Sequence, residues 1–136
     1  MSEPAAPRPP AAVHHLAVLS SDLGRSEAFY LGVLGLPLLR RHLSEDGAHR
    51  STWVGLGERC FLALERADPE AARRAETGAG WHCVALAIAP EEREAWRARL
   101  AAAGHPVERE TRFTLYARDP DGALVGLSHH PEPALV

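Results

Sequence analysis

The sequence predicts an α+β fold in which one strand–helix–strand–strand–strand plan occurs twice. The first observation is a repeat: a histidine leads a short apolar run at His15 and again at His82, and a helix-start signal follows each run. The second is the spacing of turn residues, which divides the rest of the chain into short strand-like runs. A chain of 136 residues that is 46% hydrophobic is long enough to bury one core.

The first copy of the plan is expected over residues 13–66. It opens with a mostly apolar strand over 13–19. Ser21 and Asp22 then provide N-cap side chains for a helix over 23–34, and Gly35 stands where a glycine commonly ends a helix. Phe29 and Tyr30 fall on the apolar face of this helix and are predicted to be core residues. Strands are predicted next at 37–43, 51–56 and 60–65.

The second copy is expected over residues 81–128, after a charged link over 67–80 without clear periodicity. A strand is predicted over 81–88. Pro90 suits the first turn of a helix, and Gly104 ends that helix. Three strands follow at 107–111, 113–118 and 124–128, with the turn Asp119–Gly122 between the last two. Residues 1–12 and 129–136 are expected to be a disordered Pro/Ala-rich tail and a loose tail.

Composition limits the partners and the compartment. The net charge is −3 with acidic and basic residues interspersed, which argues against a nucleic-acid-binding face. The only cysteines, Cys60 and Cys83, make a disulfide framework unexpected and fit a reducing cytoplasm. No apolar run approaches the ~20 residues that span a membrane, and the N-terminus lacks the apolar stretch of a signal peptide. We therefore expect a cytoplasmic protein without nucleic-acid or membrane partners.

Two segments carry a resemblance to a known family. Residues His15–Leu36 contain the order Asp-Leu, Phe-Tyr and Leu-Gly-Leu, and residues Tyr116–Leu127 contain Arg-Asp-Pro-Asp-Gly. In this order and spacing, over roughly residues 13–128, the chain resembles the vicinal oxygen chelate superfamily of glyoxalase I, extradiol dioxygenases, fosfomycin-resistance thiol transferases and bleomycin-resistance proteins. The resemblance implies two paired βαβββ modules whose curled mixed sheets surround a cleft, a divalent metal (Zn, Ni, Mn or Fe) and a homodimer.

The resemblance also implies four ligand positions, which fall on His15, Ala63, His82 and Gly126. Carboxylates are expected at the second and fourth positions, and this sequence has none there. Because a two-histidine site without a carboxylate holds a metal weakly, the metal site is predicted to be degraded. Glu65 points the same way as Ala63 along a strand and is a weak substitute.

Two functions remain open from the sequence. The first is a binder of a small molecule in a cleft near His15 and His82, similar to the bleomycin-resistance branch, with Trp53 as a candidate cleft residue. The alternative is a divergent metal-dependent lyase, isomerase, dioxygenase or thiol transferase that uses both histidines and Glu65. Strand alternation predicts that Cys83 faces the helix, away from this cleft. No catalytic residue is identified.

Overall fold

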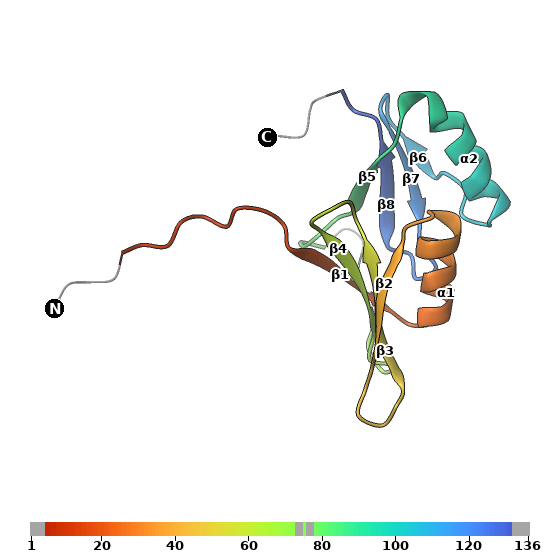
Figure 1. Ribbon diagram of the computed structural model, residues 1–136. Coiled ribbons are helices and arrows are strands. Elements are labelled where there is room, and N and C mark those ends of the chain that lie inside the picture. Colours follow the sequence, from red (N-terminus) through yellow and green to blue (C-terminus); the bar gives the residue numbers. More distant parts are fainter. Residues whose placement is uncertain (1–4, 73–74, 76–77, 132–136) are drawn as a thin grey trace.

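The computed structural model describes residues 5–72, 75 and 78–131, and in this part of the chain the strands form two four-stranded sheets (Figure 1). The first module contains β1 (His15–Ser20), α1 (Leu23–Glu27), the π-helical segment η1 (Ala28–Val33), β2 (Leu38–Leu43), β3 (His49–Gly55) and β4 (Phe61–Arg66). The second contains β5 (Val84–Ala87), the 3-10 turn η2 (Pro90–Glu92), α2 (Arg93–Ala102), β6 (Arg109–Glu110), β7 (Thr114–Arg118) and β8 (Leu124–Ser128).

The two sheets have the same topology, which confirms the predicted α+β fold with two βαβββ modules. The strand orders are β1-β4-β3-β2 and β5-β8-β7-β6. In each sheet the first and last strands of the module pair in parallel, and the other pairs are antiparallel. The sheets are not closed into barrels. Parts of the predicted loose segments, residues 1–4, 73–74, 76–77 and 132–136, lie outside the described residues.

The helices lie on one side of both sheets (Figure 1). Side chains alternate along a strand, so each strand sends every second residue toward the helices. In β4, Leu62 and Leu64 are buried in the core on that side. Phe29 and Tyr30 are each 1% exposed, which confirms that they are core residues. The opposite side of each sheet carries no helix, and we call it the open face.

The first helix differs in detail from the expected single α-helix. It begins as predicted, because the Asp22 carboxylate accepts a hydrogen bond from the Arg25 N–H at 3.1 Å. After Glu27 the helix widens, and the Leu34 N–H donates to the Phe29 carbonyl at 2.9 Å. Sequence periodicity does not distinguish this i→i+5 pattern from an α-helix, so the π-helical segment was not predictable.

The turn Asp119–Gly122 joins the second module to the first. The Tyr30 hydroxyl donates to the buried Asp119 carboxylate at 2.8 Å, and the backbone N–H and the hydroxyl of Ser21 donate to Asp121. Burial and the adjacent Asp119 carboxylate raise the pKa of the Tyr30 phenol far above its usual range. The turn itself was predicted from sequence, but its contact with Ser21 and with Tyr30 of η1, which we call the clasp, was not.

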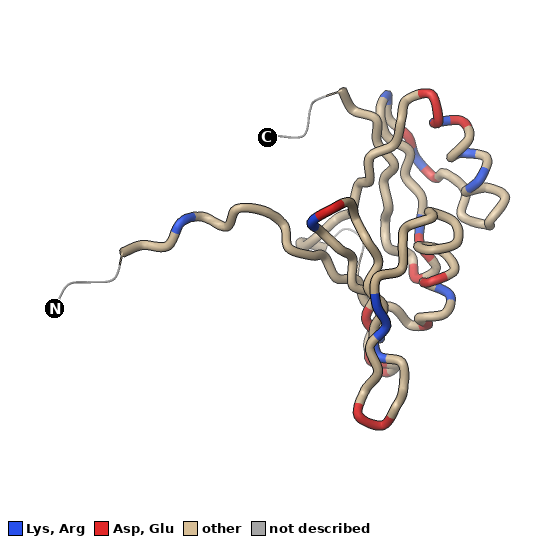
Figure 2. Tube along the Cα trace, viewed as in Figure 1, with Lys and Arg blue, Asp and Glu red and all other residues tan. Residues whose placement is uncertain are grey.

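Charge and hydropathy add two observations. In Figure 2, acidic and basic residues are interspersed over both modules. No helix within residues 5–72, 75 or 78–131 is long and apolar enough to cross a membrane.

Candidate functional site

Four rings cross the open face of the first sheet, one from each strand: His15 on β1, Phe61 on β4, Trp53 on β3 and His42 on β2. The rings of His15 and Phe61 stack with centroids 4.8 Å apart and planes 7° apart. Phe61 and Trp53 stack at 4.3 Å, and Trp53 meets His42 at 4.4 Å. We call this continuous set the ring row. It joins two residues predicted for the cleft, His15 and Trp53, with two that were not.

The missed members of the ring row depend on strand register. The pairing of β2 with β3 shifts between Leu38 and Arg40, and beyond this shift His42 lies opposite Ser51. Arg41 then points toward α1, where its guanidinium donates to the Glu27 carboxylate at 2.7 and 3.0 Å, and His42 points to the open face. A register shift of this kind has no reliable sequence signal. The alternation of Phe61 with Leu62 and Leu64 was the one available clue.

The ring of His42 has a polar atom with no partner. Its Nε2 atom is buried and makes no hydrogen bond in the described part of the protein. A buried nitrogen without a partner costs free energy, and a ligand group that bonded it would recover this cost.

Ala63 lies under the ring row. It is opposite Trp53 on β3 and opposite Ala17 on β1, and it is 1% exposed although it belongs to the open face. At this position the family resemblance would require a carboxylate. The side chain present is a methyl group, and the neighbouring side chains cover it.

In the second module, side chains of the neighbouring strands crowd Gly126, the ligand position that the resemblance implies. A Cβ atom added to Gly126 would lie 3.2 Å from Thr114 Cγ2, 3.3 Å from Tyr116 Cε1 and 3.5 Å from Ala85 Cβ. These three residues belong to the strands on either side of Gly126. The Tyr116 ring therefore occupies space that a side chain at position 126 would need. Arg109 lies over the same ring, with its guanidinium carbon 4.6 Å from the centroid.

The histidine of the second module lies outside its strand. The predicted strand began at Trp81, but β5 begins at Val84, and both His82 and Cys83 are exposed. Within β5, Val84 and Leu86 pack toward the core. The prediction that Cys83 faces the helix is therefore wrong, because Cys83 is exposed and precedes a strand whose core-facing residues are even-numbered.

Register shows which residue of the second module corresponds to His15. His15 stands two residues before Ala17, which pairs with Ala63. In the second module Ala85 pairs with Gly126, and the residue two before it is Cys83. Within the described residues no hydrogen bond or ring contact joins His82 to His15. The repeated histidines thus occupy positions that differ by one residue.

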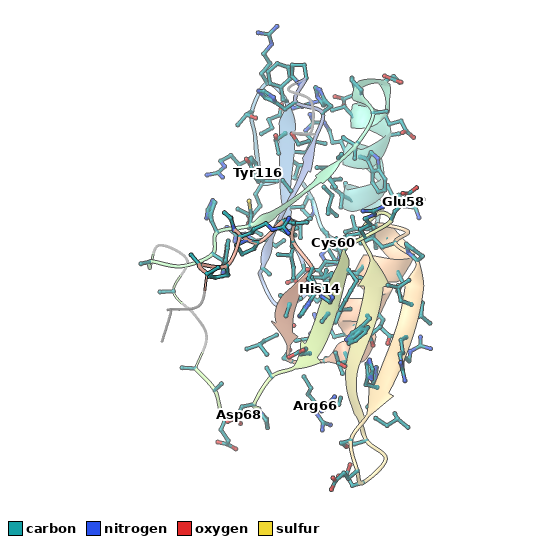
Figure 3. All side chains as sticks on the ribbon, turned by 60° about the vertical axis from the view of Figure 1, so that its left-hand side comes forward. His14, Glu58, Cys60, Arg66, Asp68 and Tyr116 are labelled. Carbon is teal, nitrogen blue, oxygen red and sulfur yellow. The ribbon has the colours of Figure 1, made fainter. Side chains whose placement is uncertain are left out.

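The ring of His15 is within hydrogen-bond distance of the ring of His14. Its Nδ1 atom lies 2.9 Å from the Nδ1 atom of His14, and the His14 ring also meets the edge of Phe61 at 5.8 Å. In Figure 3, which turns the left-hand side of Figure 1 toward the viewer, the labelled His14 belongs to the first module and the labelled Tyr116 to the second. A short contact between two ring nitrogens requires one of them to donate and the other to accept.

The residues at the four ligand positions do not fit a catalytic divalent metal. Ala63 and Gly126 contribute no donor atom. Glu65, the weak substitute, is exposed and lies opposite Leu19 and Ser51, two residues beyond Ala63. In residues 5–72, 75 and 78–131 no three His, Cys, Asp or Glu side chains converge as a metal site would require.

Two shallow hollows lie on the helix side of the molecule, away from the ring row. Their volumes are about 210 and 290 Å³, and both include Arg25, His105 and Pro120. None of the residues predicted for the cleft lines either hollow. These hollows therefore do not coincide with the cleft that the sequence predicts near His15 and His82.

Comparison with known proteins adds a family and several structural relatives. The sequence model of the Glyoxalase/Bleomycin resistance protein/Dioxygenase superfamily matches residues 12–127. The structure is similar to a lactoylglutathione lyase from Agrobacterium tumefaciens, with a TM-score of 0.67 and 26% identity, over 90% of this chain and 96% of that protein. A comparison with curated proteins finds no match.

Two further solved structures share the fold at lower identity. A glyoxalase/dioxygenase from Nostoc punctiforme has a TM-score of 0.77 and 20% identity, over 97% of this chain and 99% of that one. A mutant fosfomycin resistance protein from Listeria monocytogenes, in a complex with Mn(II) and 1S,2S-dihydroxypropylphosphonic acid, has a TM-score of 0.72 and 15% identity. This match covers 90% of this chain and 94% of the fosfomycin resistance protein.

Proposed function

This chain belongs to the Glyoxalase/Bleomycin resistance protein/Dioxygenase superfamily, and we propose that it binds a small organic molecule against the ring row without a metal ion. The ring row is the observation that supports this function. Aromatic faces and edges bind flat apolar groups through stacking and edge-to-face contacts, and they bury large areas at low entropic cost.

The proposed site offers polar groups beside the rings. His42 Nε2 is buried without a partner, and Ser51 lies opposite His42 on the neighbouring strand. Both groups are buried, so a ligand with one hydrogen-bonding group at the edge of a flat apolar body would match this arrangement once the His42 ring turns to expose Nε2. A few polar groups at a mostly apolar site fix a ligand's orientation.

The alternative is a metal-dependent lyase, isomerase, dioxygenase or thiol transferase, which would need donors that this chain's ligand positions lack. Such an enzyme would have to use His15 and His82 with Glu65. Glu65 is displaced along its strand by two residues, about 7 Å, from the expected carboxylate position. We therefore favour the metal-free binder.

A fluorescent aromatic probe tests the binding site. We expect 8-anilinonaphthalene-1-sulfonate to bind saturably and with a weaker apparent affinity in Trp53→Ala. Trp81→Ala is the matched control, because Trp81 is 92% exposed and its removal leaves the ring row intact. Unchanged probe binding in a folded Trp53→Ala variant, or an equal loss in the control, would contradict the proposed site.

Metal content tests the absence of a cofactor. Elemental analysis of the protein purified without added metal is expected to give far less than one Zn, Ni, Mn or Fe per chain. Stoichiometric metal that disappears in His15→Ala or His82→Ala would overturn the metal-free proposal.

We also propose that the chain forms a homodimer. Leu19 and Leu39 are exposed, and Leu39 lies near Gly55, where an added Cβ would be 3.6 Å from its Cδ2 atom. Exposed apolar groups beside a ring row favour coverage by a second chain. Light scattering is expected to give twice the chain mass, and a monomer mass at micromolar concentration would contradict the proposal.

A further inference from the structure

The segment before β1 has an unusual composition and position. Residues 5–12 consist of four alanines, three prolines and Arg8, and all of them are exposed. The segment leaves the body on the side opposite the helices, which is the side of the open faces (Figure 1). We call residues 5–12 the arm.

The arm is preorganised for one type of contact. Proline fixes its own φ angle and biases the residue before it toward extended conformations. Pro7, Pro9 and Pro10 therefore favour a polyproline II helix, which exposes its apolar rings and has little conformational entropy left to lose. Segments of this kind bind to surfaces lined by aromatic side chains.

The arm is attached next to such a surface. His15, which follows it by three residues, is the first ring of the ring row, and the chain bends at Ala12. Eight residues of polyproline II helix span ~25 Å. The distance across the four strands of the first sheet, three strand spacings, is ~14 Å. The arm is thus long enough to cross the whole ring row.

Charge complementarity favours the arm of this chain as the occupant. Arg8 is the only charged residue of the arm. Glu65 is exposed on the same open face as Phe61, and in the described part of the chain it forms no ion pair. The one charge of the arm is therefore matched by an exposed acidic side chain on β4, two residues along the strand from Ala63.

We propose that the arm folds back over the ring row of its own chain as a polyproline II strap, with Arg8 beside Glu65, and that it competes with a ligand for the same rings. The strap itself does not depend on the proposed function. The competition does rest on that function, because it requires a ligand at the same site.

The strap is tested by the accessibility of Trp53 without any ligand. In a Trp81→Phe/Trp96→Phe background, Trp53 is the only tryptophan, and acrylamide quenching of its fluorescence reports how often the row is uncovered. If the arm covers the rings half of the time, replacing Pro7, Pro9 and Pro10 by serine increases the quenching constant about twofold. Equal quenching with and without the prolines would overturn the strap.

Charge variants test the proposed pairing of Arg8 with Glu65. Arg8→Glu is expected to increase quenching, and adding Glu65→Lys is expected to restore the original value. A quenching constant that stays high in the double variant would contradict the Arg8–Glu65 pairing. Quenching that rises on dilution in the parent but not in the proline variants would show that the arm of a second copy covers the row, which overturns the intramolecular form.

The competition is measured separately with the naphthalene probe used above. The proline variants are expected to bind the probe about twofold more tightly than the parent. If quenching changes but no variant binds the probe at all, the strap stands and the proposed binding function fails. If the probe binds equally to both while quenching changes, the competition fails.

Discussion

The two modules share one plan, but their open faces differ at the positions where the family resemblance implies a carboxylate. In the first module Ala63 remains as a small side chain, and rings from all four strands form a row across the sheet above it. In the second module Gly126 has no side chain, and the Tyr116 ring lies where one would be. The first face presents a continuous row of rings, whereas on the second face the Tyr116 ring crowds the space beside Gly126. Function is therefore expected to belong mainly to the first module.

The largest expected effect tests whether the modules, despite these different faces, share one core. Leu64 and Leu115 are both fully buried in the single core cluster, one from each module. Leu64→Ala and Leu115→Ala are each expected to lower the free energy of unfolding by about 2–5 kcal/mol. Urea denaturation should show one transition in both variants. Two separate transitions would indicate that the modules fold independently.

The next effect tests the packing of the second face. Gly126→Ala is expected to destabilise the protein by about 1–3 kcal/mol, because the new Cβ would crowd Thr114 and Tyr116. In a Tyr116→Ala background the same change should cost clearly less, and a double-mutant cycle of unfolding free energies measures the difference. Identical costs in both backgrounds would show that the Tyr116 ring does not restrict position 126.

A pH experiment compares the ion pair that joins α1 to β2 with the ion pair that joins α2 to β6. The hydrogen bonds from Arg41, opposed by burial and assisted by Thr52, lower the pKa of Glu27, whose side chain is 15% exposed. The bond from Arg97 lowers the pKa of Glu110 in the second module, where the side chain is 48% exposed. A carboxyl group with a lowered folded-state pKa stabilises the protein above its unfolded value of about 4.3. That contribution is lost as pH falls through the lower folded-state value.

Acidification from about pH 6 to about pH 3 is therefore expected to destabilise the parent protein more than Glu27→Gln. Glu110→Gln is the matched control and should reduce the acid sensitivity less, since water screens its more exposed ion pair. The measurement is the unfolding free energy at several pH values. Equal acid sensitivity of Glu27→Gln and the parent would contradict the assignment.

The smallest effect is expected at the surface of the second module. Arg97 pairs with Glu94 and Glu110, at 3.0 and 2.6 Å, on an exposed helix face. Arg97→Ala should leave the melting temperature nearly unchanged, because exposed ion pairs contribute little to stability. Arg41→Ala, which removes the main partner of the less exposed Glu27, should lower the melting temperature more. A larger decrease of the melting temperature in Arg97→Ala than in Arg41→Ala would contradict the view that the less exposed ion pair stabilises the protein more.

The sequence predicted the order of elements because its signals are local. The N-cap at Asp22 and the turn Asp119–Gly122 depend on residues a few positions apart, and both occur as expected. The start of β5 was misplaced because Trp81 and His82 are compatible with a strand, yet they lie outside the sheet. Local pattern does not show where pairing with a neighbouring strand stops.

The candidate site was only partly predictable for the same reason. His15 and Trp53 were identified from strand position and residue type. His42 joins them through a register shift between β2 and β3, and Tyr116 reaches Gly126 through the pairing of β7 with β8. These contacts join residues far apart in sequence or depend on an irregularity. They become visible only when the strands are paired in space.

The clasp has a consequence for how the protein acquires its structure. Ser21 and Asp121 are 100 residues apart, and Tyr30 and Asp119 are 89 apart. Closing such long loops costs more entropy than forming a hairpin, so we expect these bonds to form late on the folding pathway. During synthesis at about 5–20 residues per second, the turn Asp119–Gly122 is made several seconds after the first helix. In that interval its aromatic side chains depend on the first sheet alone for protection from aggregation.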